Sequence, residues 1–446
     1  MSKKTVSGVM LTLLLTSVLA FAFTVQSHRA KLNTIEEHAS VGTLPELGEF
    51  TGVLYAGTSN LAGVYRYTSD TGWEAMTSVP NSEDVRIETP HPYPDNYVNT
   101  WTITRPSAAV MRIHFTYIRI ESRYDHIYVK SHDGIIINHY SEEYTDIWSG
   151  TVPGNTIHVQ FTSDPSINYD GFVIDRLDWS TAQGLGIQEY AVLSLVDYRG
   201  HLYAGTMSAS NPQEGVGRVH RYDGEGQHVW TMVGDKMGDR VSSLIVFNDR
   251  LYAGTSWGSG RLYRYEGESK WTKVVDYTEW SGIRSSYVWN NMLYLGDVAD
   301  DKIGQYDGTT FQHIASLGGS CIYDFESYNG CLYAGAYQGR LLGSPDGESW
   351  SVVSEGLGPH MWELETFQDY LYMSLDSGEL QRFDGTTRQT VWTAPDGIIS
   401  MVACGDRLFI GTGGEAGAFQ GSVSGISRIY QFDGVQVNAI SDLLGR

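Results

Sequence analysis

The stretch that decides the fold is Leu251-Tyr-Ala-Gly-Thr255, because it recurs along most of the chain. Copies or close variants begin at Leu54, Leu202, Leu251, Leu293, Leu332, Leu371 and Leu408. From the second copy onward the copies lie 49, 42, 39, 39 and 37 residues apart, whereas the first interval is 148 residues. A period of this size marks a repeated unit that buries its apolar face against the next unit. The sequence therefore predicts a repeat scaffold that is interrupted once.

Each unit reads as four short strands joined by tight turns. In the third unit, apolar residues 241–247 meet a turn at Asn248-Asp249, and the repeated phrase follows. A variable loop, a strand at 262–265, an acidic turn and a last strand opened by Trp271 complete the unit. Seven such units favour a seven-bladed β-propeller over an open sheet, because radial repetition leaves no long exposed edge. The predicted fold class is all-β, with blade 1 at 40–81 and blades 2–7 at 187–446.

An Asp-Gly pair recurs at the turn between the third and fourth strands. It occurs at Asp223-Gly224, Asp307-Gly308, Asp384-Gly385 and Asp433-Gly434. In the fifth unit the turn reads Ser344-Pro-Asp-Gly-Glu-Ser-Trp350. This stretch resembles a shortened Asp-box of the sialidase-type repeat families. The aspartates of such boxes are structural, so we expect a turn role for these aspartates and infer nothing about sialidase activity from them.

The charge composition indicates which classes of binding partner are favoured. The 446 residues include 52 acidic and 30 basic side chains, which gives a formal net charge of −22. Such a field repels nucleic acid and anionic membranes and favours cations or basic groups on other proteins. A turn at Asn329-Gly330 pairs Tyr328 with Cys331 and leaves Cys321 more than about 20 Å away along its strand, beyond disulfide reach. With Cys404 the only other cysteine, we expect packing rather than disulfides to hold the fold.

The N-terminus carries an export signal in its composition. Lys3 and Lys4 precede an uncharged run from Val9 to Val25. This pattern predicts a signal peptide within residues 1–30, cleaved after Ala22 or Ala30. The alternative is an uncleaved membrane anchor, since 17 residues are just enough to span a bilayer. Both interpretations place the rest of the chain outside the cell, secreted or at the cell surface.

Two loops between second and third strands are long, and both flank blade 1. They run from Thr206 to Gly217 in blade 2 and from Thr412 to Ser427 in blade 7. The inserted block leaves blade 1 on the same face of the disc. Insertions that surface loops tolerate without a function are one explanation of this length. We favour the other, that this face is a docking or binding surface.

The inserted block, residues 82–180, replaces the repeat with alternating strands. They are predicted at 101–104, 111–115, 126–129, 156–161 and 171–174, a pattern typical of a small antiparallel sandwich. Three stretches resemble a CUB domain in the expected order. They are Pro92-Tyr-Pro-Asp-Asn-Tyr97 with Trp101-Thr-Ile103, Ile118-Arg-Ile-Glu121 with Tyr124-Asp125, and Phe161-Thr-Ser-Asp164 with Asp170-Gly-Phe172. The block has no cysteine, whereas many CUB domains have two disulfides, and its segment from Glu121 to Asp125 is short.

The resemblance implies a calcium site. Carried over by position, its ligands are Glu121, Asp125, Asp164 and Tyr97, with backbone carbonyls near Ser166 or Asn168 completing the shell. Three carboxylates that converge from separate loops repel one another unless a hard cation neutralises them, and Ca²⁺ takes six to eight oxygens. Three solvated loop acids are the alternative. In the family such ligands often grip a basic side chain of a protein partner, and a lysine ammonium suits an acidic rim.

A competing hypothesis places an enzyme in the propeller channel. The residues eight positions before each repeated leucine form a column: Glu46, Ser194, Ser243, Ser285, Asp324, Glu363 and Ser400. Glu326 lies two residues after Asp324, and Glu365 lies two residues after Glu363. These acids could act as an acid/base pair in a glycoside hydrolase or lyase, hold a second cation, or simply line a hydrated channel. No other catalytic motif is present.

The sequence thus predicts an exported, non-enzymatic recognition or adhesion protein. Its CUB-like module would bind an extracellular protein or a glycan in a calcium-dependent way, on a propeller scaffold.

Overall fold

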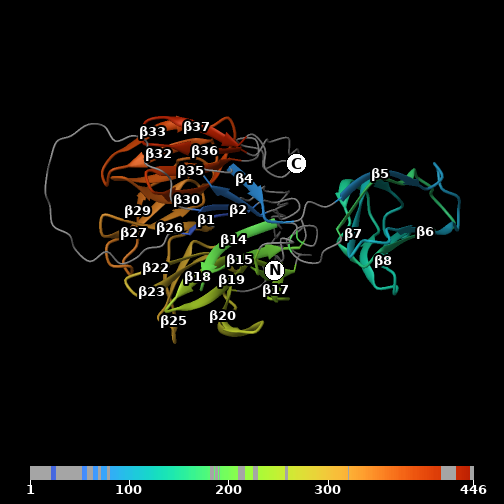
Figure 1. The fold of residues 1–446 in the computed structure, drawn as a ribbon, viewed down its shortest axis with the longest axis horizontal. Coiled ribbons are helices and arrows are strands. Elements are labelled where there is room, and N and C mark those ends of the chain that lie inside the picture. Colours follow the sequence, from blue (N-terminus) through green and yellow to red (C-terminus); the bar gives the residue numbers. More distant parts are fainter. Residues whose placement is uncertain are drawn as a thin grey trace, which may run out of the picture.

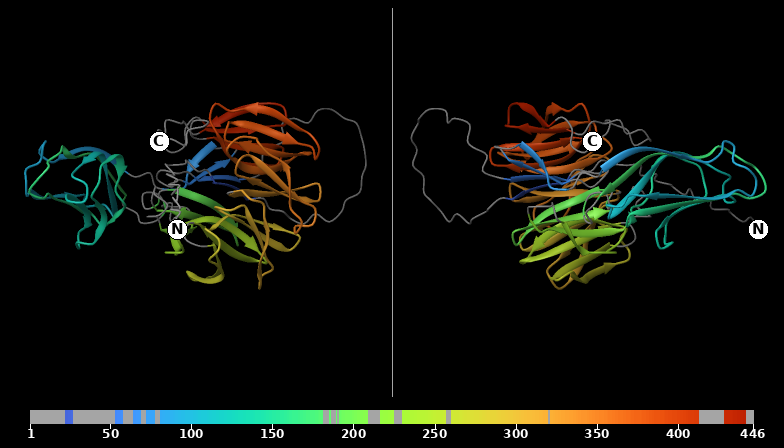
Figure 2. Two further views of the ribbon diagram at one scale, coloured as in Figure 1. Left: turned by 180° about the vertical axis from the view of Figure 1, so that it is seen from behind. Right: turned by 45° about the vertical axis from the view of Figure 1, so that its right-hand side comes forward.

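The computed structural model describes residues 22–26, 53–57, 64–68, 72–77, 81–180, 185, 189, 191–208, 216–224, 230–256, 260–319, 321–412 and 428–441. These residues form antiparallel strands in two kinds of sheet (Figure 1). Small four-stranded sheets repeat along the chain, and a two-sheet sandwich at 81–180 interrupts them. Figure 2 shows the sandwich as a body separate from the repeated sheets. No helix in the described part of the chain has the length and apolar character needed to span a bilayer.

Seven of the described sheets have four strands each in simple sequence order, as the repeat predicts. Their strands are β1 (Ala22–Gln26), β2 (Val53–Gly57), β3 (Val64–Thr68) and β4 (Gly72–Ala75); β14 (Ala191–Tyr198), β15 (His201–Met207), β16 (Gly217–Tyr222) and β17 (Trp230–Gly234); β18 (Arg240–Phe247), β19 (Arg250–Ser256), β20 (Gly260–Gly267) and β21 (Lys270–Tyr277); β22 (Ile283–Trp289), β23 (Met292–Asp297), β24 (Lys302–Tyr306) and β25 (Phe311–Ser316); β26 (Ile322–Tyr328), β27 (Cys331–Ala336), β28 (Arg340–Ser344) and β29 (Ser351–Ser354); β30 (Met361–Phe367), β31 (Tyr370–Leu375), β32 (Glu379–Phe383) and β33 (Arg388–Thr393); β34 (Ile398–Cys404), β35 (Arg407–Thr412), β36 (Arg428–Phe432) and β37 (Val437–Ser441). The result is a repeat fold of the propeller type.

The repeated phrase forms the second strand of each sheet, and its leucine is buried in every copy. Its glycine lets the next sheet approach. A Cβ on Gly254 would lie 2.7 Å from Ile283 Cγ2, and one on Gly296 would lie 2.7 Å from Ile322. The first strands contact one another in chain order, from β14 to β18, β22, β26, β30 and β34, and β1 contacts both β14 and β34. The phrase therefore encodes both a strand and the contact between sheets.

The turns follow the sequence prediction. Asn248-Asp249 and Asn329-Gly330 both have left-handed φ at both residues, which matches the right-handed twist of a two-residue hairpin. Tyr328 pairs with Cys331, as predicted, and all three cysteines are free. In the Ser344–Trp350 turn, Asp346 accepts main-chain hydrogen bonds from Glu348 (2.9 Å) and Ser349 (2.6 Å), which is a structural role.

The first sheet differs from the predicted domain boundary. We placed blade 1 at 40–81 and assigned residues 1–30 to a leader. In the structure Ala22–Gln26 forms β1 and pairs with β2, with Ala22 opposite Gly57. Residue Glu46, which we expected in this position, lies outside the described residues. Strand β1 fills the edge position beside β2, with a register that runs from Ala22 opposite Gly57 to Gln26 opposite Val53.

The sandwich packs two sheets face to face. One contains β10 (Tyr144–Trp148), β7 (Val110–Arg119), β13 (Gly171–Ser180) and β5 (Asn81–Glu88), with β11 (Val152–Pro153) on β7; the other contains β6 (Val98–Thr104), β12 (Thr156–Thr162), β8 (His126–Ser131) and β9 (Ile136–Tyr140). Alternating residues fill its core, among them Ile113, Phe115, Val159, Phe161 and Phe172. The predicted sandwich is present, and its five predicted strands all lie within observed ones.

Strand β17 of the second sheet contacts the segment in which the chain leaves the first sheet. Trp230 of β17 is buried and donates its indole N–H to the carbonyl of Met76, just after β4 (3.0 Å). This bond joins the first and second sheets across the insertion. Most of the two long loops that we expected beside it, 209–215 and 413–427, lies outside the described residues.

Candidate functional site

Three acidic side chains meet at one end of the sandwich. Glu121 follows β7, Asp125 immediately precedes β8, and Asp164 follows β12. One carboxylate oxygen from each lies within 4.8 Å of the other two. The two sheets of a sandwich end at the same rim, which is why residues 43 positions apart in the chain come together here. The structure thus brings together the three carboxylates that the sequence predicts as metal ligands.

Asp125 is the buried centre of this group. It is fully buried and accepts hydrogen bonds from the Tyr93 hydroxyl, from the Asp164 main-chain N–H (2.9 Å) and from the Glu121 main-chain N–H (3.3 Å). Burial, followed by the hydrogen bond to Asp125, raises the pKa of Tyr93, which keeps its hydroxyl a donor. Asp125 therefore holds the loops that carry the other two acids.

The surroundings of the Glu121 carboxylate disfavour its charged form. Its Oε2 is buried and has no hydrogen-bond partner among the described residues. Burial, and then the charges of Asp164 and Asp125, raise the pKa of Glu121 above its ordinary value. Two oxygens on opposite sides of one Ca²⁺ are separated by about 4.6–5.2 Å, twice the usual bond length. The three carboxylate oxygens lie close enough together to coordinate one ion. The buried Oε2 of Glu121, which has no hydrogen-bond partner among the described residues, would then gain that ion as its partner.

The remaining predicted ligands lie around the acids in other roles. Tyr97 packs its ring against Phe161, at 6.0 Å between ring centroids, and donates its main-chain N–H to Ser163 Oγ (2.8 Å). Ser166 donates its main-chain N–H to Asp164 Oδ1 (2.9 Å), and Asn168 donates its side-chain amide to Asp95 (2.6 Å). The hydroxyl that reaches the acids is that of Tyr93.

Tyr93 was missed in the sequence because the resemblance pointed to the second tyrosine of Tyr93-Pro-Asp-Asn-Tyr97. Tyr93 could have been found from its place in the same rim loop as Tyr97. Tyr93 lies in a loop at the same rim, and its ring packs edge-on against Phe161 of the core, at 4.9 Å between centroids. A buried tyrosine needs an acceptor for its hydroxyl, and a buried carboxylate needs donors.

Large apolar side chains surround the acids. Tyr124, next to Asp125, is 62% exposed, and Ile167 and Tyr169, on the loop after Asp164, are 55% and 43% exposed. Val98, which pairs with Thr162 at the end of β12, is 65% exposed. Apolar side chains grouped around polar ones on a surface are typical of an interaction site rather than of a solvated edge.

The residues of the predicted column occupy equivalent register positions in five of the described sheets. Ser194, Ser243, Ser285, Asp324 and Ser400 each pair with the glycine of the repeated phrase. The first strands of the second to seventh sheets each carry a register shift at or just before this residue, whereas β1 pairs with β2 without one. In the sixth sheet the shift spans Trp362 and Glu363, and Ser374 replaces the glycine; its Oγ accepts from the Glu363 N–H (2.9 Å).

The column acids interact directly. Asp324 Oδ2 accepts a hydrogen bond from the Leu364 N–H (2.9 Å), and its charge acts on Glu363. Burial raises the pKa of Asp324 to about 6, and burial and then the Asp324 charge raise the pKa of Glu363 well above its ordinary value. The same two causes raise the pKa of Glu326 to about 7. Glu365 instead accepts from the Ala403 N–H (2.9 Å). Burial and mutual repulsion therefore favour the protonated forms of Asp324, Glu326 and Glu363, and the charge of Arg284 opposes the shifts of Asp324 and Glu363.

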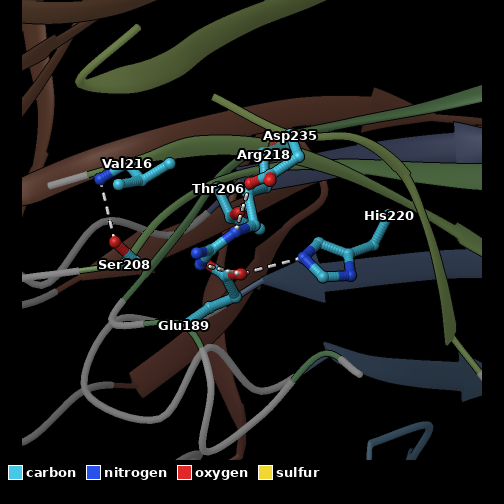
Figure 3. A network of polar contacts seen from close by, with 7 residues as sticks. All are labelled: Glu189, Thr206, Ser208, Val216, Arg218, His220 and Asp235. Atoms are coloured by element: carbon cyan, nitrogen blue, oxygen red, sulfur yellow. Dashed lines mark hydrogen bonds and ion pairs between the residues drawn. The ribbon is translucent and has the colours of Figure 1, made fainter. Parts of the chain in front are cut away.

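A second buried network, which the sequence did not reveal, lies where the chain re-enters the second sheet (Figure 3). Glu189 and His220 are both buried, and Glu189 Oε1 lies 3.0 Å from His220 Nε2 and 3.0 Å from a guanidinium nitrogen of Arg218. Arg218 also bonds Asp235 (3.0 Å). Glu189 belongs to the segment that returns from the sandwich, so the network fixes that segment to β16.

Comparisons with known proteins give structural neighbours only. No family model matches the chain, and no curated protein matches its sequence. The extracellular domain of the "putative hybrid two component system" from B. thetaiotaomicron is similar at a TM-score of 0.44 and 15% identity, over 57% of this chain. This chain covers 34% of that protein, about a third of its length. Sqt1 of Saccharomyces cerevisiae has a TM-score of 0.41 and 15% identity, over 58% of this chain and 75% of its own. The computationally designed Ika8 protein has a TM-score of 0.38 and 14% identity, over 63% and 84%.

Proposed function

We propose that this chain is an exported recognition protein whose sandwich binds a partner in a calcium-dependent way. The scaffold in this proposal is a closed seven-bladed propeller, supported by the contacts of β1 with both β14 and β34. The sandwich is proposed to be CUB-like, on the motifs around Tyr93, Glu121 and Asp164. The observation that carries the proposal is the convergence of three carboxylates, one with an orphaned buried oxygen.

The ion would be held by Glu121, Asp125 and Asp164. When bound, it supplies positive charge that cancels their repulsion and orders the loops that carry them. Tyr93 orients Asp125 by its hydrogen bond, as outer groups commonly do for a metal ligand. Calcium binding is therefore expected to be coupled to the shape of this rim.

The partner is proposed to be an extracellular or cell-surface protein that presents a basic side chain. A lysine or arginine would meet the carboxylates left partly unneutralised by the ion. Tyr124, Ile167 and Tyr169 would pack on apolar groups beside it, since they are exposed around the acids. A glycan is the other ligand class, and it would use the same tyrosines for stacking on sugar rings.

Calcium titration of the whole protein tests the ion. We expect saturable heat of binding and a rise in melting temperature, both lost in Glu121→Gln and retained in Asp133→Asn. Asp133 is a matched control because it lies in the sandwich but bonds only locally, with Ser131 its side-chain partner. No binding at millimolar calcium would refute the site.

A second experiment tests recognition. Candidate extracellular proteins are immobilised with and without acetylation of their lysines, and binding is measured with calcium and with EDTA. Capture that needs both calcium and unmodified lysine supports the proposed partner. Capture of glycans alone on an array would favour the glycan class instead.

A second candidate function is a glycan-active enzyme in the channel. The interacting acids Asp324 and Glu363, whose pKa values are raised, favour it, because an acid/base pair needs one carboxyl that stays protonated near neutral pH. Incubation with a polysaccharide panel decides between the candidates. Product release that is lost in Asp324→Asn or Glu363→Gln would replace recognition with catalysis as the function.

A further inference from the structure

Two histidines meet on the outer face of the sandwich, on the sheet β6-β12-β8-β9. His126 is the first residue of β8, and His139 lies in β9. Residues alternate between the core and the surface along β8, and the half-buried ones are His126, Tyr128 and Lys130. His139 pairs directly with Tyr128, so His126 is its diagonal neighbour on the same face. Its Nε2 lies 3.0 Å from His126 Nδ1.

The neighbours of the pair hold both rings. The ring of Tyr128 is stacked on His139 at 4.7 Å between centroids, with 7° between the ring planes, and it also contacts His126 at 6.0 Å. The one nearby ammonium on the strand, Lys130, is hydrogen-bonded to Gln160 of β12 (2.6 Å). Because both rings sit on paired strands rather than on a loop, the two facing nitrogens are held by rigid elements.

At 3.0 Å one imidazole N–H donates a hydrogen bond to the other ring's nitrogen, and a metal ion could take the place of that shared proton. Imidazole nitrogens bind a transition metal at about 2.0–2.1 Å. Two nitrogens 3.0 Å apart, both at that distance from one ion, give an N–metal–N angle of about 94°. This angle suits a square-planar or octahedral ion, whereas tetrahedral Zn²⁺ prefers an angle near about 109°. Tetragonal sites with nitrogen ligands are typical of Cu²⁺ and Ni²⁺.

We propose that His126 and His139 form a surface site for a divalent transition metal of the Cu²⁺ or Ni²⁺ class. The remaining coordination positions are open to water or to a ligand from a partner. The site is independent of the carboxylate cluster, because calcium prefers oxygen ligands and copper prefers imidazole. His126 and Asp125 are adjacent, yet Asp125 is buried and His126 is on the outer face.

The test uses the full chain in calcium-containing buffer and Cu²⁺ as the probe. Titration is followed by calorimetry and by electron paramagnetic resonance, which shows nitrogen couplings when imidazole binds. We expect a tetragonal signal with two nitrogens, and an affinity about 10–100-fold or more lower in His139→Asn, since even outer-sphere changes cost that much. His158→Asn is the matched control: His158 lies on the same sheet, with its ring bonded to Thr102 (2.9 Å).

Two outcomes would overturn the proposal. One is unchanged affinity and nitrogen coupling in His139→Asn. The other is an equal loss in His158→Asn, which would mean diffuse binding by the histidines of this face. His139 is exposed, so its replacement is not expected to unfold the sandwich, and the retained calcium response of His139→Asn verifies this. Glu121→Gln should lose the calcium response and keep the copper signal, which separates failure of one site from failure of the other.

Discussion

At the scale of single residues, the three acids of the rim divide into different roles. Asp125 is buried and accepts hydrogen bonds from two main-chain groups and one tyrosine. Asp164 is only partly buried and accepts bonds from Ser166 on its own loop. Asp125 therefore supports the loops whether or not an ion is bound, whereas Asp164 and Glu121 are proposed to act mainly as ligands.

Replacing these acids should separate the two roles. In EDTA, Asp125→Ala is expected to lower the free energy of unfolding by at least about 1–3 kcal/mol, the cost of leaving one buried donor unpaired. Asp164→Asn in EDTA should change it little or raise it, because repulsion with Glu121 is removed. Urea unfolding of both variants checks this. Equal destabilisation by both substitutions would contradict the assigned roles.

At the scale of elements, the repeated phrase serves as the packing surface between sheets. Its glycine is opposite the first strand of the next sheet: Gly254 faces Ile283, and Gly335 faces Met361. A side chain at Gly254 would press on a β-branched residue, which is stiff. At Gly335 the added Cβ would lie 3.1 Å from the Met361 carbonyl oxygen and 3.2 and 3.4 Å from its Cγ and Sδ, so these contacts are less close than the one at Gly254.

A graded loss of stability should follow from alanine at these glycines. Gly254→Ala is expected to cost about 1–3 kcal/mol, the usual range for overpacking. Gly335→Ala should cost less, because the nearest atom would lie 3.1 Å from the added Cβ instead of 2.7 Å. Denaturant unfolding of the two variants measures the difference. A larger loss at Gly335 would show that sheet packing is not limited by these contacts.

The buried acids of the fifth and sixth sheets predict a pH effect of definite sign. The pKa of Glu326 is raised to about 7 in the folded protein, from an ordinary value of 4.5. The folded state therefore holds the proton longer than the unfolded state, so stability from this group is full below about 4.5 and is lost as pH rises through about 7. Glu326→Gln should gain stability relative to the unmodified chain across that window. The check is urea unfolding at several pH values, and a flat difference would contradict it.

At the scale of the whole molecule, the insertion and the scaffold have separate cores. The sandwich core is made only of residues between 85 and 179, and the clusters of the repeated sheets contain none of them. The Glu189 network and the bond from Trp230 to Met76 tie both ends of the insertion to the second sheet. The sandwich therefore has its own hydrophobic core, while polar contacts at both ends of the insertion join the chain to the second sheet.

Separate cores predict two transitions in calorimetry. Calcium should shift only the transition of the sandwich, by about 2.7 kcal/mol in free energy when it is present at 100 times its dissociation constant. Glu189→Ala should lower the transition of the repeated sheets, since it leaves buried His220 without its carboxylate, and should spare the calcium shift. A single transition that moves as a whole in both experiments would rule out this division.

Much of this architecture follows from the sequence alone. The spacing of the leucine phrase gave the number and order of the repeated sheets, and the alternation at 82–180 gave the sandwich. The resemblance of its motifs to a CUB domain gave Glu121, Asp125 and Asp164. The register of Ser194 and Asp324 opposite the phrase glycine followed from counting, because the same register shift recurs in both strands, whereas in the sixth sheet the shift includes Glu363.

Other features needed the tertiary structure. Strand β1 depends on which segment pairs with Gly57, and several apolar segments could do so. The choice of Tyr93 over Tyr97 depends on which ring enters the core, and the pairing of Glu189 with His220 joins a linker to a strand 31 residues away. The meeting of His126 and His139 depends on the register of β8 and β9. Sequence determines which residues form repeating local structure, because period and turn type are local properties. Only the folded chain decides which distant polar groups meet, since that depends on register and packing between strands.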